Sequence, residues 1–102
     1  MTTATAPAFE LAAQASTALS LTYFTDPGHG WLQVPVECLQ RLDIAAQITP
    51  YSYMRGGMAY LEEDCDAPRF LQAAKAAGWV VKCAEQNSNR DSFIRSLPRF
   101  VA

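Results

Sequence analysis

The sequence lacks the features that mark membrane, secreted and zinc-binding proteins. No apolar run approaches the roughly 20 residues that a membrane-spanning helix needs, and the start, Met1 to Ala4, lacks the basic residues of a signal peptide. The three cysteines, Cys38, Cys65 and Cys83, are odd in number and form no Cys-x-x-Cys pair, which argues against a disulfide scaffold or a zinc ribbon. We therefore expect a cytoplasmic protein with buried, inert thiols and no membrane association.

An excess of one charge is also missing, since 10 acidic residues stand against 8 basic ones. The charges are unevenly spread: residues 1–68 carry a net charge of −6 and residues 69–102 a net charge of +4. A protein that mimics DNA should be far more acidic, and one that binds nucleic acid more basic. Direct nucleic-acid binding is therefore not expected, while the bipolar charge favours a protein partner and is compatible with a homodimer.

What the chain does have is enough length and apolar content for one folded domain, with 102 residues of which half are hydrophobic. Residues 1–18 are rich in alanine and threonine, and we expect a flexible or weakly helical segment there. Residues 19–102 are predicted to form a single α+β domain.

Alternating and helical patterns set the predicted order of elements along that domain. Strands are expected at 19–24 and 30–34, around the turn sequence Thr-Asp-Pro-Gly, and at 51–54 and 58–61, around Arg-Gly-Gly. Helices are expected from Pro35 to Asp43 and from Asp66, as N-cap, to Gly78. Residues 79–84 and 92–96 are predicted as strands, with a short helix as the alternative for the last segment. The order β-β-α-β-β-α-β-β predicts an antiparallel or mixed sheet of five to six strands with two helices on one face.

Four stretches carry a resemblance to other proteins: Tyr23 to Trp31 (Tyr-Phe-Thr-Asp-Pro-Gly-His-Gly-Trp), Tyr51 to Gly56, Tyr60 to Asp66 and Phe93 to Ser96. Together they resemble a group of small uncharacterised proteins of proteobacterial plasmids and phages. The resemblance covers roughly residues 22–100 and implies an accessory protein of a mobile genetic element. Inhibitors of host defence, including anti-CRISPR proteins, are common in that class.

The acidic stretch Glu62-Glu63-Asp64-Cys65-Asp66 is the sharpest local feature. One interpretation is structural: Asp66 caps the following helix, and the other carboxylates lie near its positive N-terminal end. In a second interpretation, Glu62, Asp64 and Asp66 point to one side of an extended segment and hold a hard cation. In a third, the carboxylates form a patch that faces a partner.

His29, the only histidine, lies between Gly28 and Gly30 and is expected to be exposed. With Glu62, Asp64 and Asp66 it could form a small metal-dependent enzyme, which is the alternative function. No motif places a serine or cysteine nucleophile beside it. We therefore lean towards a protein that is not an enzyme and has no cofactor or metal.

The chain has four tyrosines, two tryptophans and six arginines, the residue types that dominate protein–protein hot spots. The alternative is that Trp31, Tyr60 and Trp79 are simply core residues. The preferred prediction is a non-catalytic protein-binding protein of a mobile element that inhibits a host defence complex such as CRISPR–Cas. The predicted binding residues are His29, Trp31, Tyr53, Arg55, Glu62, Glu63, Asp64, Arg90 and Arg95.

Overall fold

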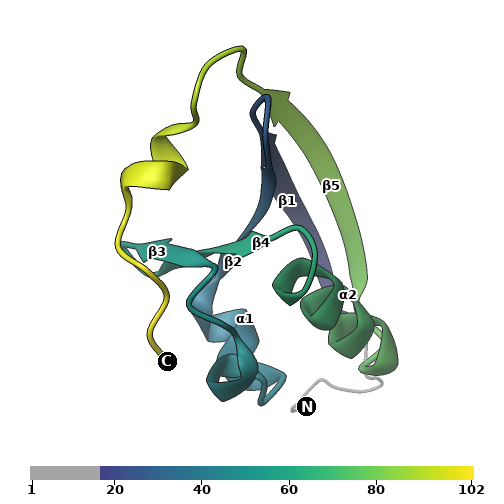
Figure 1. Ribbon diagram of the computed structural model, residues 1–102. Helices are drawn as coiled ribbons and strands as arrows, with labels where there is room; N and C mark the ends of the chain where they lie inside the picture. The colour runs from purple at the N-terminus through teal and green to yellow at the C-terminus, as the bar shows by residue number, and fades with distance from the viewer. Residues whose placement is uncertain (1–16) are drawn as a thin grey trace.

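The computed structural model describes residues 17–102, which form one mixed five-stranded sheet in the order β3-β4-β2-β1-β5. The strands are β1 (Ala18–Thr25), β2 (Gly30–Pro35), β3 (Tyr53–Arg55), β4 (Met58–Glu62) and β5 (Val80–Asn87). The helices are α1 (Val36–Arg41), α2 (Asp66–Ala76) and the short 3-10 helices η1 (Ala45–Gln47) and η2 (Phe93–Ser96) (Figure 1). The predicted α+β class is confirmed. The N-terminal segment was predicted for residues 1–18, and residues 1–16 of it lie outside the described residues. Its last residue, Ala18, is the first residue of β1.

Both predicted hairpins are present. β1 and β2 pair antiparallel around a turn closed by the hydrogen bond from Asp26 N to His29 O, at 2.9 Å. β3 and β4 pair antiparallel around Gly56 and Gly57, whose φ angles are +58° and +81°. Two successive positive φ angles suit a tight hairpin turn of type I′, which explains the glycine pair.

The last strand, β5, runs parallel to β1 and is longer than predicted. Its eight residues pair in register with the eight residues of β1, from Ala18 with Val80 to Thr25 with Asn87. The polar residues that end β5 carry no apolar pattern, so sequence reasoning assigned them to a loop. Backbone pairing with β1 extends the strand regardless of that polarity, because ladder hydrogen bonds use main-chain groups.

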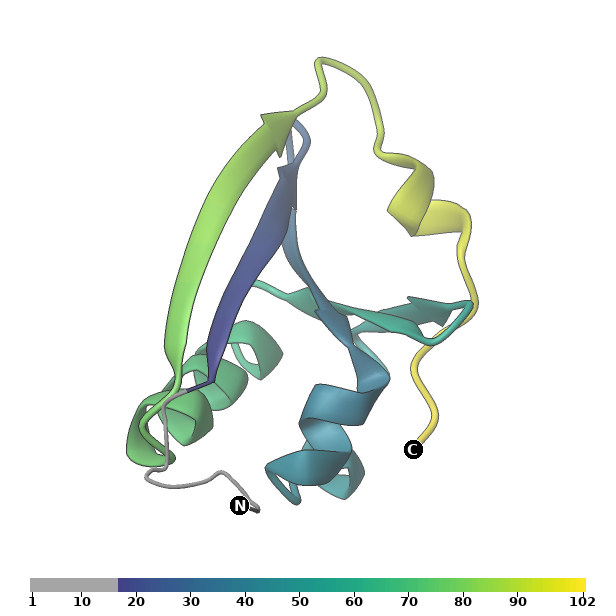
Figure 2. The same ribbon diagram turned by 180° about the vertical axis from the view of Figure 1, so that it is seen from behind.

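Residues 92–96 do not form the predicted sixth strand. Residues 93–96 form η2, the short helix that was the alternative, and Ser92 at its N-cap accepts a hydrogen bond at Oγ from Ile94 N at 3.3 Å. The tail then runs beside β3, where Met54 N donates to Pro98 O at 2.9 Å and a single bridge joins Tyr53 to Arg99. η2 therefore lies on the sheet face that the helices leave open, and the tail passes the edge strand β3 (Figures 1 and 2), so that Phe100 is buried in the cluster on the helix face.

The strands separate two hydrophobic clusters, one on each face of the sheet. The helix face holds the larger one, in which Leu32 and Val34 of β2 pack with Leu39 of α1 and Phe70 of α2. The opposite face, here called the η2 face, holds Trp31, Tyr60 and Ile94. Two helices on one face were predicted, and α1 and α2 share the same cluster.

Details of the helices differ from the prediction. Pro35 ends β2 and precedes α1, instead of lying in the first helical turn. In α2 the buried apolar residues are Ala67, Phe70 and Ala74, whereas Leu71, which helical spacing places on the apolar face, is exposed. Gly78 follows the end of α2 with a φ of +80°, as its predicted role as the stop requires. Neither α1 nor α2 nor any other described helix is long and apolar enough to cross a bilayer.

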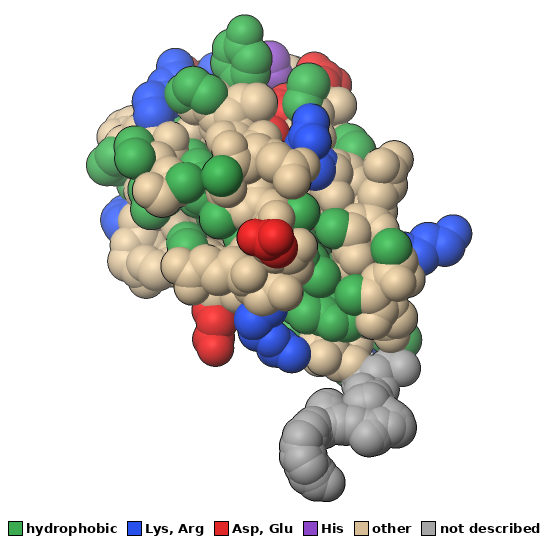
Figure 3. Space-filling model, turned by 90° about the horizontal axis from the view of Figure 1, so that it is seen from below, with side chains coloured by type: hydrophobic (Ala, Val, Ile, Leu, Met, Phe, Trp, Pro, Cys, Tyr) green, Lys and Arg blue, Asp and Glu red, His purple; other side chains and the backbone are tan. Residues whose placement is uncertain are grey.

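The underside of the molecule carries charges of both signs. Seen from below, basic and acidic side chains stand singly among apolar and neutral polar groups (Figure 3).

The thiols also differ from expectation, because Cys38 is buried but Cys65 and Cys83 are exposed. Burial raises the pKa of the Cys38 thiol.

Candidate functional site: an aromatic groove between acidic and basic residues

A groove of about 450 Å³ opens on the η2 face. It collects residues from the β1–β2 turn, from β2 and β3, from the β4–α2 connection and from the C-terminal segment. Seven of the nine predicted binding residues line it, which are His29, Trp31, Tyr53, Glu62, Glu63, Asp64 and Arg95. Four further residues complete the lining, which are Gly30, Tyr51, Cys65 and Arg99.

Aromatic rings form the floor of the groove. Trp31 is buried, and its ring meets His29 and Tyr53 in edge-on contacts with centroid distances of 6.1 and 6.4 Å. Tyr51 is 69% exposed. Trp31 is thus both a core residue and part of the site, while His29 is exposed as expected.

Gly30 keeps the first residue of β2 free of a side chain. A Cβ atom there would collide with the ring and hydroxyl of Tyr23 on the neighbouring strand. This explains the second glycine of the Gly-His-Gly sequence by packing, because any larger residue would force the Tyr23 ring to move.

Arg95 lies at the groove wall and is held by a buried aspartate. Its Nε and Nη2 donate to Asp26 Oδ2 and Oδ1 at 2.6 and 3.0 Å. Asp26 also accepts backbone hydrogen bonds from Gly28, His29 and Ser92, at 3.0, 2.9 and 2.9 Å. One carboxylate therefore fastens η2 to the β1–β2 turn, and Arg95 serves first as part of this attachment.

The electrostatics of the pair follow from this geometry. The hydrogen bonds from Arg95 hold the pKa of Asp26 well below its usual range, and the backbone donors add to that effect, while burial opposes it. The same contact raises the pKa of Arg95. Asp26 therefore stays ionised while the site is folded.

Two arginine side chains stack on the aromatic floor. The guanidinium of Arg95 lies 5.5 Å from the ring centre of Trp31, and that of Arg99 lies 4.7 Å from the ring centre of Tyr53. Arg99 Nη1 also donates to Pro50 O at 3.3 Å. The rings of this groove thus already accept guanidinium groups against their faces.

The acidic stretch is divided between structure and groove, and Asp66 does not cap α2. Cys65 is the N-cap and makes no side-chain cap bond. Glu62 does the capping, because its carboxylate accepts hydrogen bonds from the backbone N–H groups of Asp64, Cys65 and Asp66, at 2.9, 2.6 and 2.7 Å. The prediction of Asp66 as the cap was wrong, because the chain turns between the end of β4 and the start of α2 and so brings the Glu62 carboxylate to the first N–H groups of the helix.

Asp66 is instead fully buried and binds the segment before β3. Its carboxylate accepts from Thr49 N at 3.0 Å, from Thr49 Oγ1 at 2.7 Å and from Ser52 Oγ at 2.6 Å. Ser52 Oγ in turn accepts from Glu62 N at 3.0 Å. Asp66 thereby fixes the connection that carries Tyr51 and Tyr53 to the groove.

The metal-site interpretation required Glu62, Asp64, Asp66 and His29 to converge, and they do not. Asp66 is turned towards Thr49 and Ser52, and both oxygens of Glu62 are occupied by backbone donors. Within residues 17–102, no group of three or more histidine, cysteine, aspartate and glutamate side chains is placed to hold a metal ion.

Glu63 and Asp64 remain at the acidic side of the groove. Within the described part of the chain, neither carboxylate accepts a hydrogen bond, and neither forms an ion pair. Burial raises the pKa of Tyr23, and the charges of Glu63, Glu85, Asp64 and Glu62 raise it further. The carboxylates of the acidic stretch therefore also act on the Tyr23 hydroxyl of β1.

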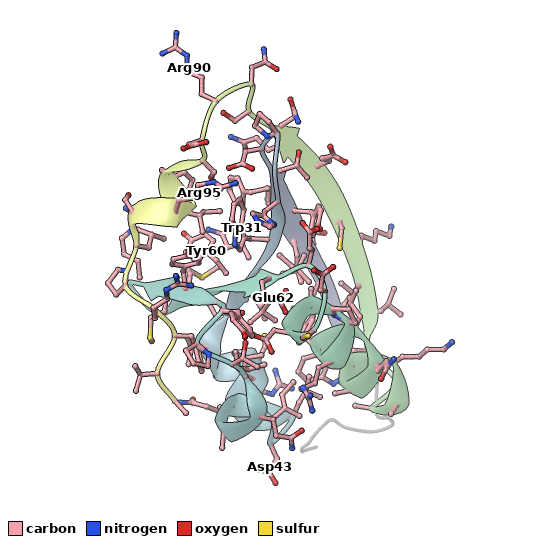
Figure 4. All side chains as sticks on the ribbon, in the orientation of Figure 1. Trp31, Asp43, Tyr60, Glu62, Arg90 and Arg95 are labelled. Carbon is pink, nitrogen blue, oxygen red and sulfur yellow. The ribbon has the colours of Figure 1, made fainter. Side chains whose placement is uncertain are left out.

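Two predicted residues lie outside the groove. Arg55 stacks its guanidinium on Phe93, 5.3 Å from the ring centre. Arg90 is exposed in the loop between β5 and η2, at the tip of the molecule and away from Trp31, Glu62 and Arg95 (Figure 4). Tyr51 and Arg99 were not among the predicted residues, although aromatic and arginine residues near β3 and at the C-terminal end were the signal that could have identified them.

Comparisons with protein-family models, with curated protein sequences and with solved structures find no match for this chain.

Proposed function

We propose that this protein is a non-catalytic protein-binding accessory protein of a mobile genetic element, and that it inhibits a host defence complex such as CRISPR–Cas. The groove is its contact site. The observation that supports binding is that one concave surface combines Trp31, Tyr53 and Tyr51 with Arg95 and Arg99. These are the residue types on which interface energy concentrates. The mobile-element context rests on the resemblance of four stretches of the sequence.

The groove suits binding better than catalysis. Arg95 of its lining is paired with the buried Asp26, and Glu62 is occupied by three backbone donors. A general base or nucleophile would have to be free to exchange a proton or attack a substrate. The exposed groups of the groove are rings and charges suited to contact with a partner.

Phage infection of strains that each carry one defence system tests the proposal. Expression of the protein should restore plaque formation in at least one strain. A Tyr51→Ala/Arg99→Ala variant should lose that effect, because it removes exposed groove contacts with little loss of core packing. A matched control, Leu71→Ala/Lys75→Ala on the exposed side of α2, should retain it.

Circular dichroism melting of both variants shows whether they remain folded. The defence-inhibitor proposal is wrong if no defence system is relieved by the unmodified protein. The role of the groove is wrong if the folded Tyr51→Ala/Arg99→Ala variant protects phage as well as the control does.

A further inference from the structure

The free charges of the groove are acidic, and this narrows the chemistry of what it binds. Arg95 is neutralised by Asp26, while Glu63 and Asp64 make no ion pair within residues 17–102. The Glu62 carboxylate, whose oxygens accept backbone hydrogen bonds, lies beside them in the lining. Against these three carboxylates stands the one unneutralised cation of the described lining, Arg99. The groove therefore attracts a positive group.

The aromatic residues of the groove also favour a positively charged ligand. Trp31 and Tyr53 each carry a guanidinium of the protein itself on their rings. Tyr51 borders the same groove, is 69% exposed, and has no cation stacked on it among the described residues. An exposed ring that lines the same groove as free carboxylates is a surface on which a further cation can stack.

We propose that the groove binds an arginine side chain displayed by the partner protein, with the guanidinium held by Glu63 and Asp64 and its flat face against Tyr51. This inference rests on the proposed function and specifies the partner residue that the site recognises. Arginine fits better than lysine because its planar guanidinium can both pair with a carboxylate through two N–H groups and stack on a ring. The groove volume of about 450 Å³ is large enough for one such side chain and its neighbouring backbone.

An acidic side chain fits the groove less well. Arg95 already directs Nε and Nη2 to Asp26, and Arg99 uses Nη1 on Pro50 O. An incoming carboxylate would meet donors that are largely occupied and would approach Glu62, Glu63 and Asp64. Like charges brought together in this way oppose binding.

Single amino-acid probes test the proposal without a known partner. N-acetyl-arginine amide is titrated into the ¹⁵N-labelled protein, with the side-chain N–H of Trp31 as reporter. Trp79, which stacks with Arg41 away from the groove lining, provides an internal reference. The arginine probe should shift the Trp31 signal and leave Trp79 unchanged.

The matched probes differ in charge or shape alone. N-acetyl-citrulline amide has nearly the shape of the arginine probe but no charge, and it should bind roughly tenfold more weakly, because it lacks the charge-assisted hydrogen bonds. The lysine probe should fall between the two, and the N-acetyl-glutamate amide probe should bind most weakly. Equal binding of arginine and citrulline, or preference for glutamate, would overturn the proposal.

Variants assign the binding to the two carboxylates. Glu63→Gln/Asp64→Asn should weaken arginine binding about tenfold or more, since it removes both charges at nearly constant shape. Glu37→Gln, an exposed change on α1, removes a carboxylate outside the groove lining and should leave binding unchanged. Undiminished binding by the double variant would also contradict the proposal.

The probe and phage experiments fail separately. If the arginine probe does not bind but Tyr51→Ala/Arg99→Ala abolishes phage protection, the arginine inference is wrong and the proposed function stands. If the probe binds as described but the folded groove variant still protects phage, the proposed function of the groove is wrong while the arginine site stands.

Discussion

The two faces of the sheet are held by different kinds of interaction. On the helix face, 13 buried residues form one cluster, which includes residues of α1 and α2 and of strands β1, β2 and β4. On the η2 face, three buried residues form the cluster, and a buried carboxylate with an arginine fastens the covering segment. One face depends on apolar area, and the other on a few directional bonds.

Each face also has one aspartate with a fully buried side chain, Asp26 or Asp66. The two aspartates differ in the hydrogen-bond donors that surround the carboxylate. Asp26, on the η2 side, meets a guanidinium and three backbone N–H groups. Asp66 meets two hydroxyl groups and one backbone N–H. The comparison indicates why the groove lies on the η2 face: a short helix fixed at one point covers less of the sheet than two helices packed along it.

The largest effect is expected from breaking the helix face. Phe70 of α2 is completely buried, and Phe70→Ala should lower the free energy of unfolding by about 3–5 kcal/mol, because it removes a large apolar group and leaves a cavity. Urea denaturation followed by circular dichroism measures this. A loss of less than about 1 kcal/mol would show that the helix face is not the main source of stability.

Breaking the attachment on the η2 face should cost less. Asp26→Asn keeps one carbonyl acceptor but removes the negative charge to which Arg95 and Ser92 donate hydrogen bonds. We expect the free energy of unfolding to fall by about 2–4 kcal/mol. Asp91→Asn is the matched control, because Asp91 is exposed and lies 3.9 Å from the same arginine. Its loss should stay within about 0–1 kcal/mol. Similar losses in both variants would contradict a special role for Asp26.

Acid should distinguish Asp26 further, since its folded pKa is lowered. The contribution of such a group is fully present above the unfolded pKa of about 4 and is lost as pH falls through the folded value. Stability measured from about pH 5 to pH 2 should therefore decline less steeply in Asp26→Asn than in the unmodified protein. Parallel profiles would show that the ion pair does not contribute to acid sensitivity.

A smaller effect is expected at Asp66, and it separates capping from burial. Asp66→Ala and Asp66→Ser should both lower stability by about 1–3 kcal/mol, since neither can satisfy the donors of Thr49 and Ser52. A serine at a helix N-cap would instead recover most of the loss. Thermal melting of the two variants decides the matter, and recovery in Asp66→Ser would restore the capping interpretation that the contacts contradict.

The smallest effect concerns the observed cap. Glu62→Ala should cost about 0.5–2 kcal/mol, because three backbone N–H groups at the start of α2 lose their acceptor. Glu63→Ala is the control, and it should change stability by no more than about 0.5 kcal/mol. Chemical denaturation of both variants provides the measurement. Equal losses would show that the charge near the helix start matters and the cap bonds do not.

Several parts of this fold were determined by local sequence. Gly56 and Gly57 supply the positive φ angles of a tight hairpin, and Gly78 supplies the one that ends α2. Alternation along β2 and β4 assigns Leu32 and Leu61 to one face and Trp31 and Tyr60 to the other. These features depend on neighbours in the chain, so residue type and spacing were sufficient to predict the α+β class.

Seven of the nine predicted binding residues come together in one groove for a related reason. Aromatic residues and carboxylates at the ends of neighbouring strands, such as Trp31 and Glu62, pair directly in the sheet and so reach one groove. Arg55 and Arg90 were chosen by residue type alone, and their positions depend on where η2 and the loop before it pack. Residue type indicates what a surface can bind, but not which residues share it.

Tertiary structure alone decided the bonds that join distant segments. Asp26 and Arg95 are 69 residues apart, and Asp66 and Thr49 are 17 apart, so no local pattern links either pair. Residues 92–96 are short enough to suit a strand or a helix, and Asp26 together with Ser92 selects η2. A buried carboxylate takes whichever donors the packed chain brings to it, because leaving the charge unpaired costs more than any local preference contributes.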